Sequence, residues 1–209
     1  NTAMGRGALH TATTAQSNVA IGDSAMYQAP AGVGVQACVA IGNAVMSDVS
    51  SLGTNATGTT AIGGGGILGT LKNVAGITAV GYLTFQNLQV GQHSTALGYE
   101  TGRYASGSYN TFVGSQAGKG GTTSAPYSTG INNTALGYQA LTAFTTGDYN
   151  IAIGKNAMVL CTTGERNIAI GVEALDARTT NFNDNIAIGH WALSNLNDGN
   201  SDYNIAIGA

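Results

Sequence analysis

A nine-residue pattern recurs along the chain and constrains its fold more than any other feature. NTALGYQAL at 133–141 is followed by NIAIGKNAM at 150–158, NIAIGVEAL at 167–175 and NIAIGHWAL at 185–193. Each copy holds one glycine after a short alternating segment, and we call this glycine the anchor. The anchors, 16 to 23 residues apart, are Gly5, Gly22, Gly42, Gly63, Gly81, Gly98, Gly114, Gly137, Gly154, Gly171, Gly189 and Gly208. Repeats of about 20 residues are typical of solenoids. We therefore predict one repetitive domain over 1–209, a segment of a longer fibrous protein.

The composition argues against several other classes of protein. The chain has 32 glycines without the every-third spacing of collagen, and 43% hydrophobic residues, too many for a disordered chain. A net charge of −3 gives no basic footprint for nucleic acid. No apolar run reaches about 18 residues, so we expect no membrane insertion by this segment.

The three residues before each anchor alternate in a way that predicts a short strand. The residue directly before the anchor is bulky and apolar, and the third before it is Thr, Val or Ile. The residue between them is alanine, as at Ala152, in every copy except the one that holds Phe112. This period of two places the alanines on one face of a strand and the bulky residues on the other. We expect both faces to be buried, and the anchor glycine to end or bend the strand.

An apolar residue usually returns four positions after the anchor, as at Leu141 and Met158. We interpret this as a second short strand that folds back over the first, with polar turns closing each coil. The predicted fold is all-β: a parallel β-roll or β-solenoid of about 11 coils of 16–23 residues. Stacking at about 4.8 Å per coil would give a rod roughly 50 Å long.

Asparagine stands four residues before the anchor in eight of the twelve copies, including Asn150 and Asn167. Stacked identical asparagines can hydrogen-bond to one another up a rod, as in cross-β ladders. The alternative is that asparagine is there because it tolerates a turn conformation. The sequence leaves both readings open, and they are compatible.

Two strands per coil enclose little volume, which leaves the alanine face flat and apolar in this interpretation. Such a face favours association, and cyclic self-association would cover it in all coils at once. We choose a homotrimer, intertwined or side by side, although the spacing alone does not fix the number of chains.

The motifs NVAIGDSAM, NIAIGKNAM and NTALGYQAL resemble the head repeats of trimeric autotransporter adhesins, the YadA-like heads. The resemblance covers the whole chain and implies a left-handed parallel β-roll trimer that attaches to surfaces outside the cell. The same module is similar to parts of bacteriophage tail fibres. Adhesin heads repeat at about 14 residues, whereas the longer coils here, with turns such as ALTAFTTGDYN at 140–150, are more like the phage form.

The sequence offers no sign of an enzyme, and we predict no cofactor and no metal. GGGILG at 64–69 fits the G-x-G-x-x-G pattern, but no helical pattern follows it, and the first acidic residue after it is Glu100. His10, His93 and His190 occupy different coils and different positions within them. Nothing in the repeat would bring them together with a nucleophile.

Cys38 and Cys161 are the only cysteines. They lie about seven coils, or roughly 34 Å, apart, which is far beyond the reach of a disulfide. We predict two free, packed thiols.

Candidate binding residues lie where the repeat is interrupted. Phe112 replaces the alanine, Gly118 replaces the returning apolar residue, and the longest gap between anchors follows. The extra residues at 119–132 predict a loop in which Lys119 and Tyr127 could contact a glycan or protein. An inert longer turn is the alternative.

A second set of candidates directly follows the anchors. Tyr82, Tyr99 and Tyr138 take the first position after the anchor, mixed with polar residues, and Trp191 takes the second position of its coil. The mixture predicts exposure, and exposed aromatic rings stack on sugars. Packing between chains of a trimer is the alternative.

The preferred function is an extracellular attachment fibre, a bacteriophage tail-fibre segment that binds a glycan or protein of the host cell surface. Three chains would present three copies of each weak site. One alternative is the head of a bacterial trimeric autotransporter adhesin on the cell surface. The other is a purely structural spacer or filament subunit.

Overall fold

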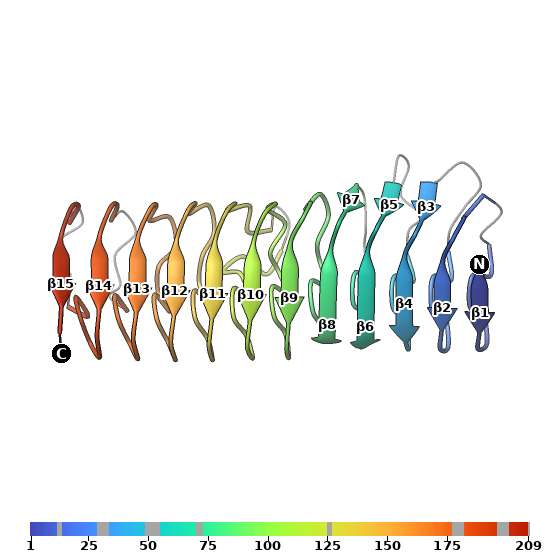
Figure 1. Cartoon of the computed structure of the whole chain (residues 1–209), viewed down its shortest axis with the longest axis horizontal. Coiled ribbons are helices and arrows are strands. Elements are labelled where there is room, and N and C mark those ends of the chain that lie inside the picture. Colours follow the sequence, from blue (N-terminus) through green and yellow to red (C-terminus); the bar gives the residue numbers. More distant parts are fainter. Residues whose placement is uncertain are drawn as a thin grey trace.

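The chain forms a single row of stacked coils, a β-solenoid seen side-on in Figure 1, with the two termini at opposite ends. The computed structural model describes residues 1–11, 14–28, 34–48, 55–69, 73–124, 127–176, 182–195 and 201–208. These residues contain strands, turns and bends but no helix. The predicted all-β, parallel solenoid is therefore confirmed.

The main sheet has twelve strands, and each strand ends at, directly before or one residue after one anchor glycine. They are β1 (Thr2–Met4), β2 (Val19–Ile21), β4 (Val39–Gly42), β6 (Thr60–Gly64), β8 (Thr78–Tyr82), β9 (Thr95–Leu97), β10 (Thr111–Val113), β11 (Thr134–Leu136), β12 (Ile151–Ile153), β13 (Ile168–Ile170), β14 (Ile186–Ile188) and β15 (Ile205–Ile207). All neighbours pair in parallel, and the register keeps equivalent residues opposite each other, as for Ala135 and Ala152. Every repeat therefore repeats the same geometry one strand spacing further along the rod.

A second, smaller sheet precedes the main strands in part of the rod. It contains β3 (Gly34–Gln36), β5 (Asn55–Thr57) and β7 (Val74–Ala75), again in parallel. Single bridges between Gln16 and Gln36 and between Ala75 and Gln92 extend it by one coil on each side. This sheet lies before the anchor segment of each coil, so the predicted second strand after the anchor was wrong.

The segment after each anchor is a left-handed turn rather than a strand. Within one coil, Asn156 and Met158 both have positive φ, 57° and 51°, and the same two positions repeat this along the rod. Both residues still donate their main-chain N–H across coils, Asn156 to Tyr138 O at 2.9 Å and Met158 to Ala174 O at 3.0 Å. The ladder thus continues through the turn, which compensates for a conformation that L-residues otherwise avoid.

Glycine is required at the anchors because neighbouring coils touch there. The anchor φ angles lie between 126° and 141°. A Cβ on Gly137 would lie 2.6 Å from the carbonyl oxygen of Gly154, and Gly22, Gly154 and Gly171 face the next anchor in the same way. Gly189 likewise faces Gly208. Both the backbone angle and the lack of space exclude a side chain, which explains why glycine is the least variable residue of the repeat.

The alanine row lies inside each coil, not on an outer face. Ala152, Ala169 and Ala187 are fully buried within the chain. The bulky residues on the other face of the strands are only half-buried, and Leu136 and Ile170 are exposed. Two expectations were therefore wrong: that both strand faces are buried, and that the alanines form the flat face which demands association. Small side chains are needed inside because the strands pack closely against the turns.

Phe112 is a core substitution balanced by missing side chains around it. Its ring is fully buried and packs on Phe85 and Phe144, with centroids 6.3 and 5.6 Å away. A Cβ on Gly102 would lie 3.2 Å from the Phe112 ring, and one on Gly118 would collide with it. Both glycines keep the left-handed φ of the apolar residues that they replace. At this interruption of the repeat, the larger side chain of Phe112 therefore fills the space left by the side chains that Gly102 and Gly118 lack.

The asparagine ladder, one of the two interpretations that the sequence left open, is present. The side-chain oxygen of Asn150 accepts the main-chain N–H of Asn167 at 3.1 Å, and that of Asn167 accepts the N–H of Asn185 at 3.1 Å. The Asn167 amide also donates to the Asn150 side chain at 3.0 Å and to the Phe182 carbonyl at 2.9 Å. None of the ladder asparagines has positive φ, so the turn reading does not apply to them. That conformation belongs to the residue directly before, such as Tyr149.

Cys38 and Cys161 are free and buried, as predicted. Burial raises the pKa of the Cys161 thiol to about 12, and it also raises the pKa of Cys38. Both behave as apolar core residues.

Candidate functional site

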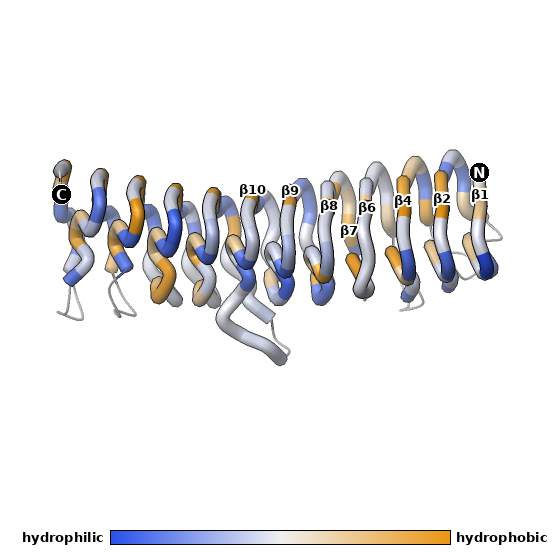
Figure 2. The backbone as a smooth tube through the Cα atoms, turned by 90° about the horizontal axis from the view of Figure 1, so that it is seen from below, coloured by the Kyte–Doolittle hydropathy of each residue, from blue (hydrophilic) through white to orange (hydrophobic). Residues whose placement is uncertain are grey.

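The most extensive unusual surface is the outward side of the main sheet. We call it the apolar outer face, and it consists of the residues one and three positions before each anchor, from Thr2 and Met4 to Ile205 and Ile207. All of these residues are Thr, Val, Ile, Leu or Met, and none carries a charge. Hydrophobic residues recur in every coil of the rod (Figure 2). A flat apolar face of this length is rare on an isolated soluble chain.

A row of aromatic rings borders this face where the strands end. We call the first positions after the anchors the strand-end column, which includes Tyr82, Tyr99, Ser115 and Tyr138. The three tyrosines are 49%, 50% and 49% exposed, respectively. The rings of Tyr82 and Tyr99 stack with centroids 5.6 Å apart and planes 12° from parallel. The repeat thus brings side chains 17 residues apart into one surface row, and the exposure expected for them is present.

Beside this column, a hydrogen-bonded network crosses several coils. Glu100 is buried and forms ion pairs with Arg103 and, at 2.8 Å, with Lys119. Gln116 donates to Glu100 at 2.9 Å, and Gln139 donates to Gln116 at 2.7 Å.

The charge environment of Glu100 favours its ionised form. Burial alone raises the pKa of Glu100, but the hydrogen bonds from Lys119 and Gln116 and the charges of Lys119 and Arg103 outweigh it. The pKa of Glu100 consequently lies below its usual value. The network links neighbouring coils. It includes the Lys119 ammonium, which the sequence analysis suggested for receptor contact.

The segment after β10 leaves the rod and projects from its side (Figure 2). It corresponds to the predicted loop at 119–132, of which residues 125 and 126 lie outside the described residues. Tyr127 is half-buried and stacks on Tyr104 with centroids 6.4 Å apart, and the Arg103 guanidinium lies 5.0 Å from the Tyr104 ring centroid. The exposed part of the segment carries Thr123, Ser124 and Thr129. The exposed part of the segment therefore offers neutral hydroxyl groups to a partner. One face of the Tyr127 ring is already covered by Tyr104.

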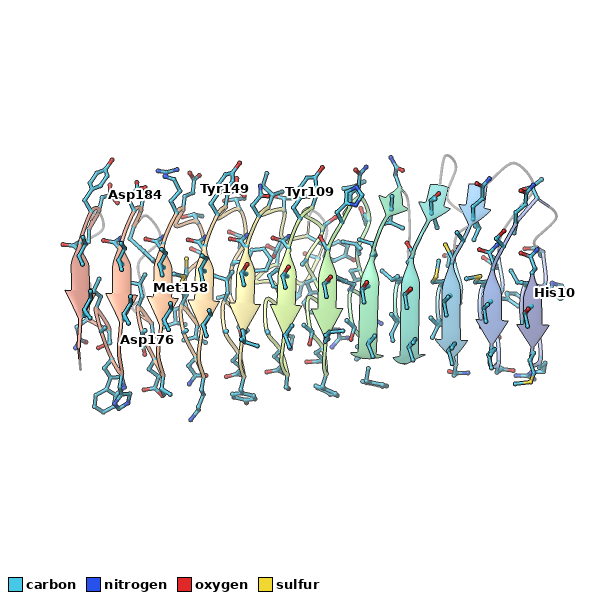
Figure 3. The ribbon with its side chains drawn as sticks, in the orientation of Figure 1. His10, Tyr109, Tyr149, Met158, Asp176 and Asp184 are labelled. Atoms are coloured by element: carbon cyan, nitrogen blue, oxygen red, sulfur yellow. The ribbon has the colours of Figure 1, made fainter. Side chains whose placement is uncertain are left out.

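A second aromatic row, which the sequence analysis missed, borders the opposite edge of the apolar outer face. We call the residues five positions before the anchors the strand-start column; His93, Tyr109, Asn132 and Tyr149 belong to it. His93 stacks on Tyr109 at 5.7 Å, and Tyr109 and Tyr149 lie along the same edge in Figure 3. Every described residue of this column has positive φ. The signal was present as a tyrosine or polar residue directly before each ladder asparagine.

Trp191 is exposed but occupied on two sides. Its ring stacks on His190 at 4.2 Å, and its indole N–H donates to Glu173 at 2.6 Å. That hydrogen bond is the main reason that the pKa of Glu173 lies below its usual value. Trp191 follows β14, which lies three coils beyond the strand of Tyr138, so the predicted binding residues do not form one site.

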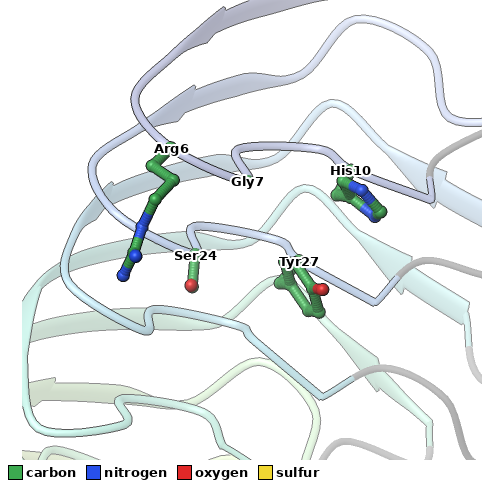
Figure 4. A pocket seen from close by; sticks show the side chains of 5 residues that line it. All are labelled: Arg6, Gly7, His10, Ser24 and Tyr27. Atoms are coloured by element: carbon green, nitrogen blue, oxygen red, sulfur yellow. The ribbon is translucent and has the colours of Figure 1, made fainter.

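A shallow pocket of about 370 Å³ lies in the first two coils (Figure 4). It is lined by Arg6, Gly7, His10, Ser24 and Tyr27, and the rings of His10 and Tyr27 stack at 5.0 Å. Arg6 pairs with Asp23 at 2.6 Å on an exposed surface. No buried polar group points into this pocket from its lining, so it has little to fix the orientation of a ligand.

Within the described ranges, no three His, Cys, Asp or Glu side chains are close enough together to hold a metal ion. The same part of the chain has no helix with the length and hydropathy of a membrane span.

Comparison with protein-family models, curated proteins and solved structures finds no match to this chain.

Proposed function

We propose that this chain is a segment of an extracellular attachment fibre, most like a bacteriophage tail fibre, which assembles as a homotrimer and binds a glycan or protein on a host cell. The observation that carries the proposal is the apolar outer face, which runs the length of the rod without a charge. A left-handed coil and the trimer follow from the resemblance to YadA-like heads.

The apolar outer face supports assembly through a new surface. Because the alanines are inside the coil, the residues available to a second chain are the isoleucines, valines, leucines and threonines of this face. Burying apolar surface contributes roughly 25 cal/mol per Å², so even partial cover along the whole rod would be substantial. Closed cyclic symmetry would give each chain the same environment.

A trimeric rod would present its aromatic columns and its projecting segment in three copies each. Weak contacts then combine, because after the first contact the others form at a high effective concentration. The exposed tyrosines and the Thr- and Ser-rich projection are chemically suited to such contacts. The same mechanics would serve a bacterial adhesin head.

The experiment has two steps. Light scattering at several concentrations should give a native mass three times the 20.9 kDa chain mass. The labelled trimer should then bind to some members of a panel of bacterial and animal cells, and binding to bacteria alone would favour the phage fibre over the adhesin. A monomer at all concentrations would overturn the assembly.

A structural spacer remains the second candidate, and two observations favour it. Lys119 is paired with Glu100, and Phe112 is a packing exchange, so the interruption of the repeat has a structural explanation. A spacer predicts a stable trimer that binds no cell in the panel.

A further inference from the structure

The strand-end column contains a gap that is one coil wide. Tyr99 and Tyr138 lie two coils apart, and the small side chain of Ser115 stands between them. On its other side, Tyr99 is held by its stack on Tyr82. Because the rings of successive coils stack along the rod, their planes lie roughly perpendicular to the rod axis. The face of the Tyr99 ring that does not contact Tyr82 is therefore directed along the column towards Tyr138.

The width of this gap favours a saturated ring over a flat one. Two coil steps separate the tyrosines by about 10 Å. A flat ring held between two others needs only about 7–8 Å, which is two van der Waals contacts of about 3.5–4.0 Å. A puckered six-membered ring is thicker and takes up more of the remainder. A single sugar ring therefore fits the spacing better than a nucleobase or another aromatic ring.

The floor of the gap offers polar partners beside the aromatic walls. The Ser115 hydroxyl has no hydrogen-bond partner among the described residues, and the side chain is only half-buried. Gln116 and Gln139 directly follow Ser115 and Tyr138 in the sequence, and a hydrogen bond of 2.7 Å joins their side-chain amides. Such groups can bond to equatorial hydroxyls at the rim of a sugar ring while the ring faces contact the tyrosines.

We propose that the gap between Tyr99 and Tyr138 binds one pyranose ring in which all substituents are equatorial, as in β-linked glucose or N-acetylglucosamine. Such a ring presents only C–H bonds on both faces, and the C–H hydrogens suit the negative faces of two aromatic rings. An axial hydroxyl, as in galactose, would be pressed against a tyrosine without a hydrogen bond, which is unfavourable. The inference rests on the proposed attachment role and names the ligand class for it.

Saturation-transfer NMR on the whole segment tests the site directly, with cellotetraose as the probe and β-1,4-galactotetraose as its axial counterpart. Wild-type protein should transfer saturation to the axial ring protons of cellotetraose, and at least five-fold less to galactotetraose. Ser115→Tyr should abolish the cellotetraose signal, because it fills the gap with a residue that the same column already carries elsewhere.

Asn132→Tyr is the matched control. Asn132 interrupts the strand-start column between Tyr109 and Tyr149 just as Ser115 interrupts the strand-end column. Asn132 precedes β11 by two residues, and Ser115 follows β10 by two residues. It should leave the cellotetraose signal unchanged, and circular dichroism should show that both variants keep the wild-type melting temperature.

No transfer to cellotetraose, equal transfer to both sugars, or a signal that survives Ser115→Tyr would overturn the sugar site. These results are independent of the attachment role, which is judged by binding of the wild-type trimer to cells. Cell binding that persists in Ser115→Tyr, with no cellotetraose signal in the wild type, would retain the fibre and reject this site.

Discussion

At the scale of single residues, the fold is held by the anchor glycines and the ladder asparagines. The anchor glycines approach one another too closely for a side chain, and the side chains of the ladder asparagines hydrogen-bond to the neighbouring coils. Asn150 and Asn167 are both buried, so their amides depend entirely on protein partners.

Replacing Asn167 with alanine should destabilise the rod by roughly 2–4 kcal/mol, because the buried N–H of Asn185 and the carbonyl of Phe182 each lose a partner. At roughly 2–4 °C per kcal/mol, the melting temperature should fall by about 4–16 °C. Asn195→Ala, at an exposed position, is the control and should change it little. Equal melting temperatures for the two variants would show that the ladder contributes no stability.

The strand and the asparagine ladder could be predicted from the sequence. The strand follows from the alternation of residues before each anchor, and the ladder follows from asparagine recurring at the same position of the repeat. The turn after the anchor could not be inferred in the same way. Ala157 and Met158 are adjacent and both fully buried, which a strand with alternating faces does not permit. That adjacent pair of apolar letters was the available sign of a turn, and the prediction of a second strand overlooked it.

At the scale of elements, coils with different side chains remain compatible when their volumes balance. Phe112 fills the space that an apolar side chain of the turn occupies in other coils, and glycine stands at that turn position. Across the same coils, the network around Glu100 joins charged groups that are far apart in sequence. The candidate sugar site lies beside this network, and its gap could not be seen before the register of the coils was known.

The volume exchange predicts a reversal of sign in a double mutant. Phe112→Ala should cost roughly 3–5 kcal/mol through a cavity, and Gly118→Leu alone should destabilise by collision with the Phe112 ring. Together the two changes restore the usual pattern, and the φ of 53° at Gly118 matches that of 52° at Leu141. The double mutant should therefore melt above both single mutants. Additive losses in a thermal denaturation cycle would refute the exchange.

The Glu100 network predicts a dependence of stability on pH. The pKa of Glu100 is lowered in the folded chain, so its contribution is complete above the unfolded value of about 4.3 and is lost as the pH falls through the lower folded value. Glu100→Gln keeps the shape but cannot be ionised. We expect the variant to be less stable by about 1–3 kcal/mol at pH 7. The difference in melting temperature should shrink towards pH 3; a constant difference would contradict the ionic contribution.

At the scale of the whole molecule, the rod separates two tasks on different surfaces. Alanines and turn residues make the interior of each coil, and the apolar outer face is the surface that the proposed assembly would cover. The aromatic columns border that face, so assembly would place them along the sides of the rod rather than hide every ring. The number of chains could not be predicted from the spacing of the repeats. This spacing indicates how the strands of one chain pair, but it does not indicate what covers the outer face of the sheet.

A charge placed on the apolar outer face should prevent assembly and leave each coil folded. Ile170 is exposed on this face, so Ile170→Lys leaves the interior of the coil intact and would bring like charges together at the centre of a trimer. Light scattering should then show a mass near the 20.9 kDa of one chain, with an unchanged far-ultraviolet circular dichroism spectrum. Val172→Lys is the control, because Val172 is also exposed but lies in the strand-end column. The control should remain trimeric, whereas dissociation of Val172→Lys alone would place the interface on the edge of the sheet and not on its face.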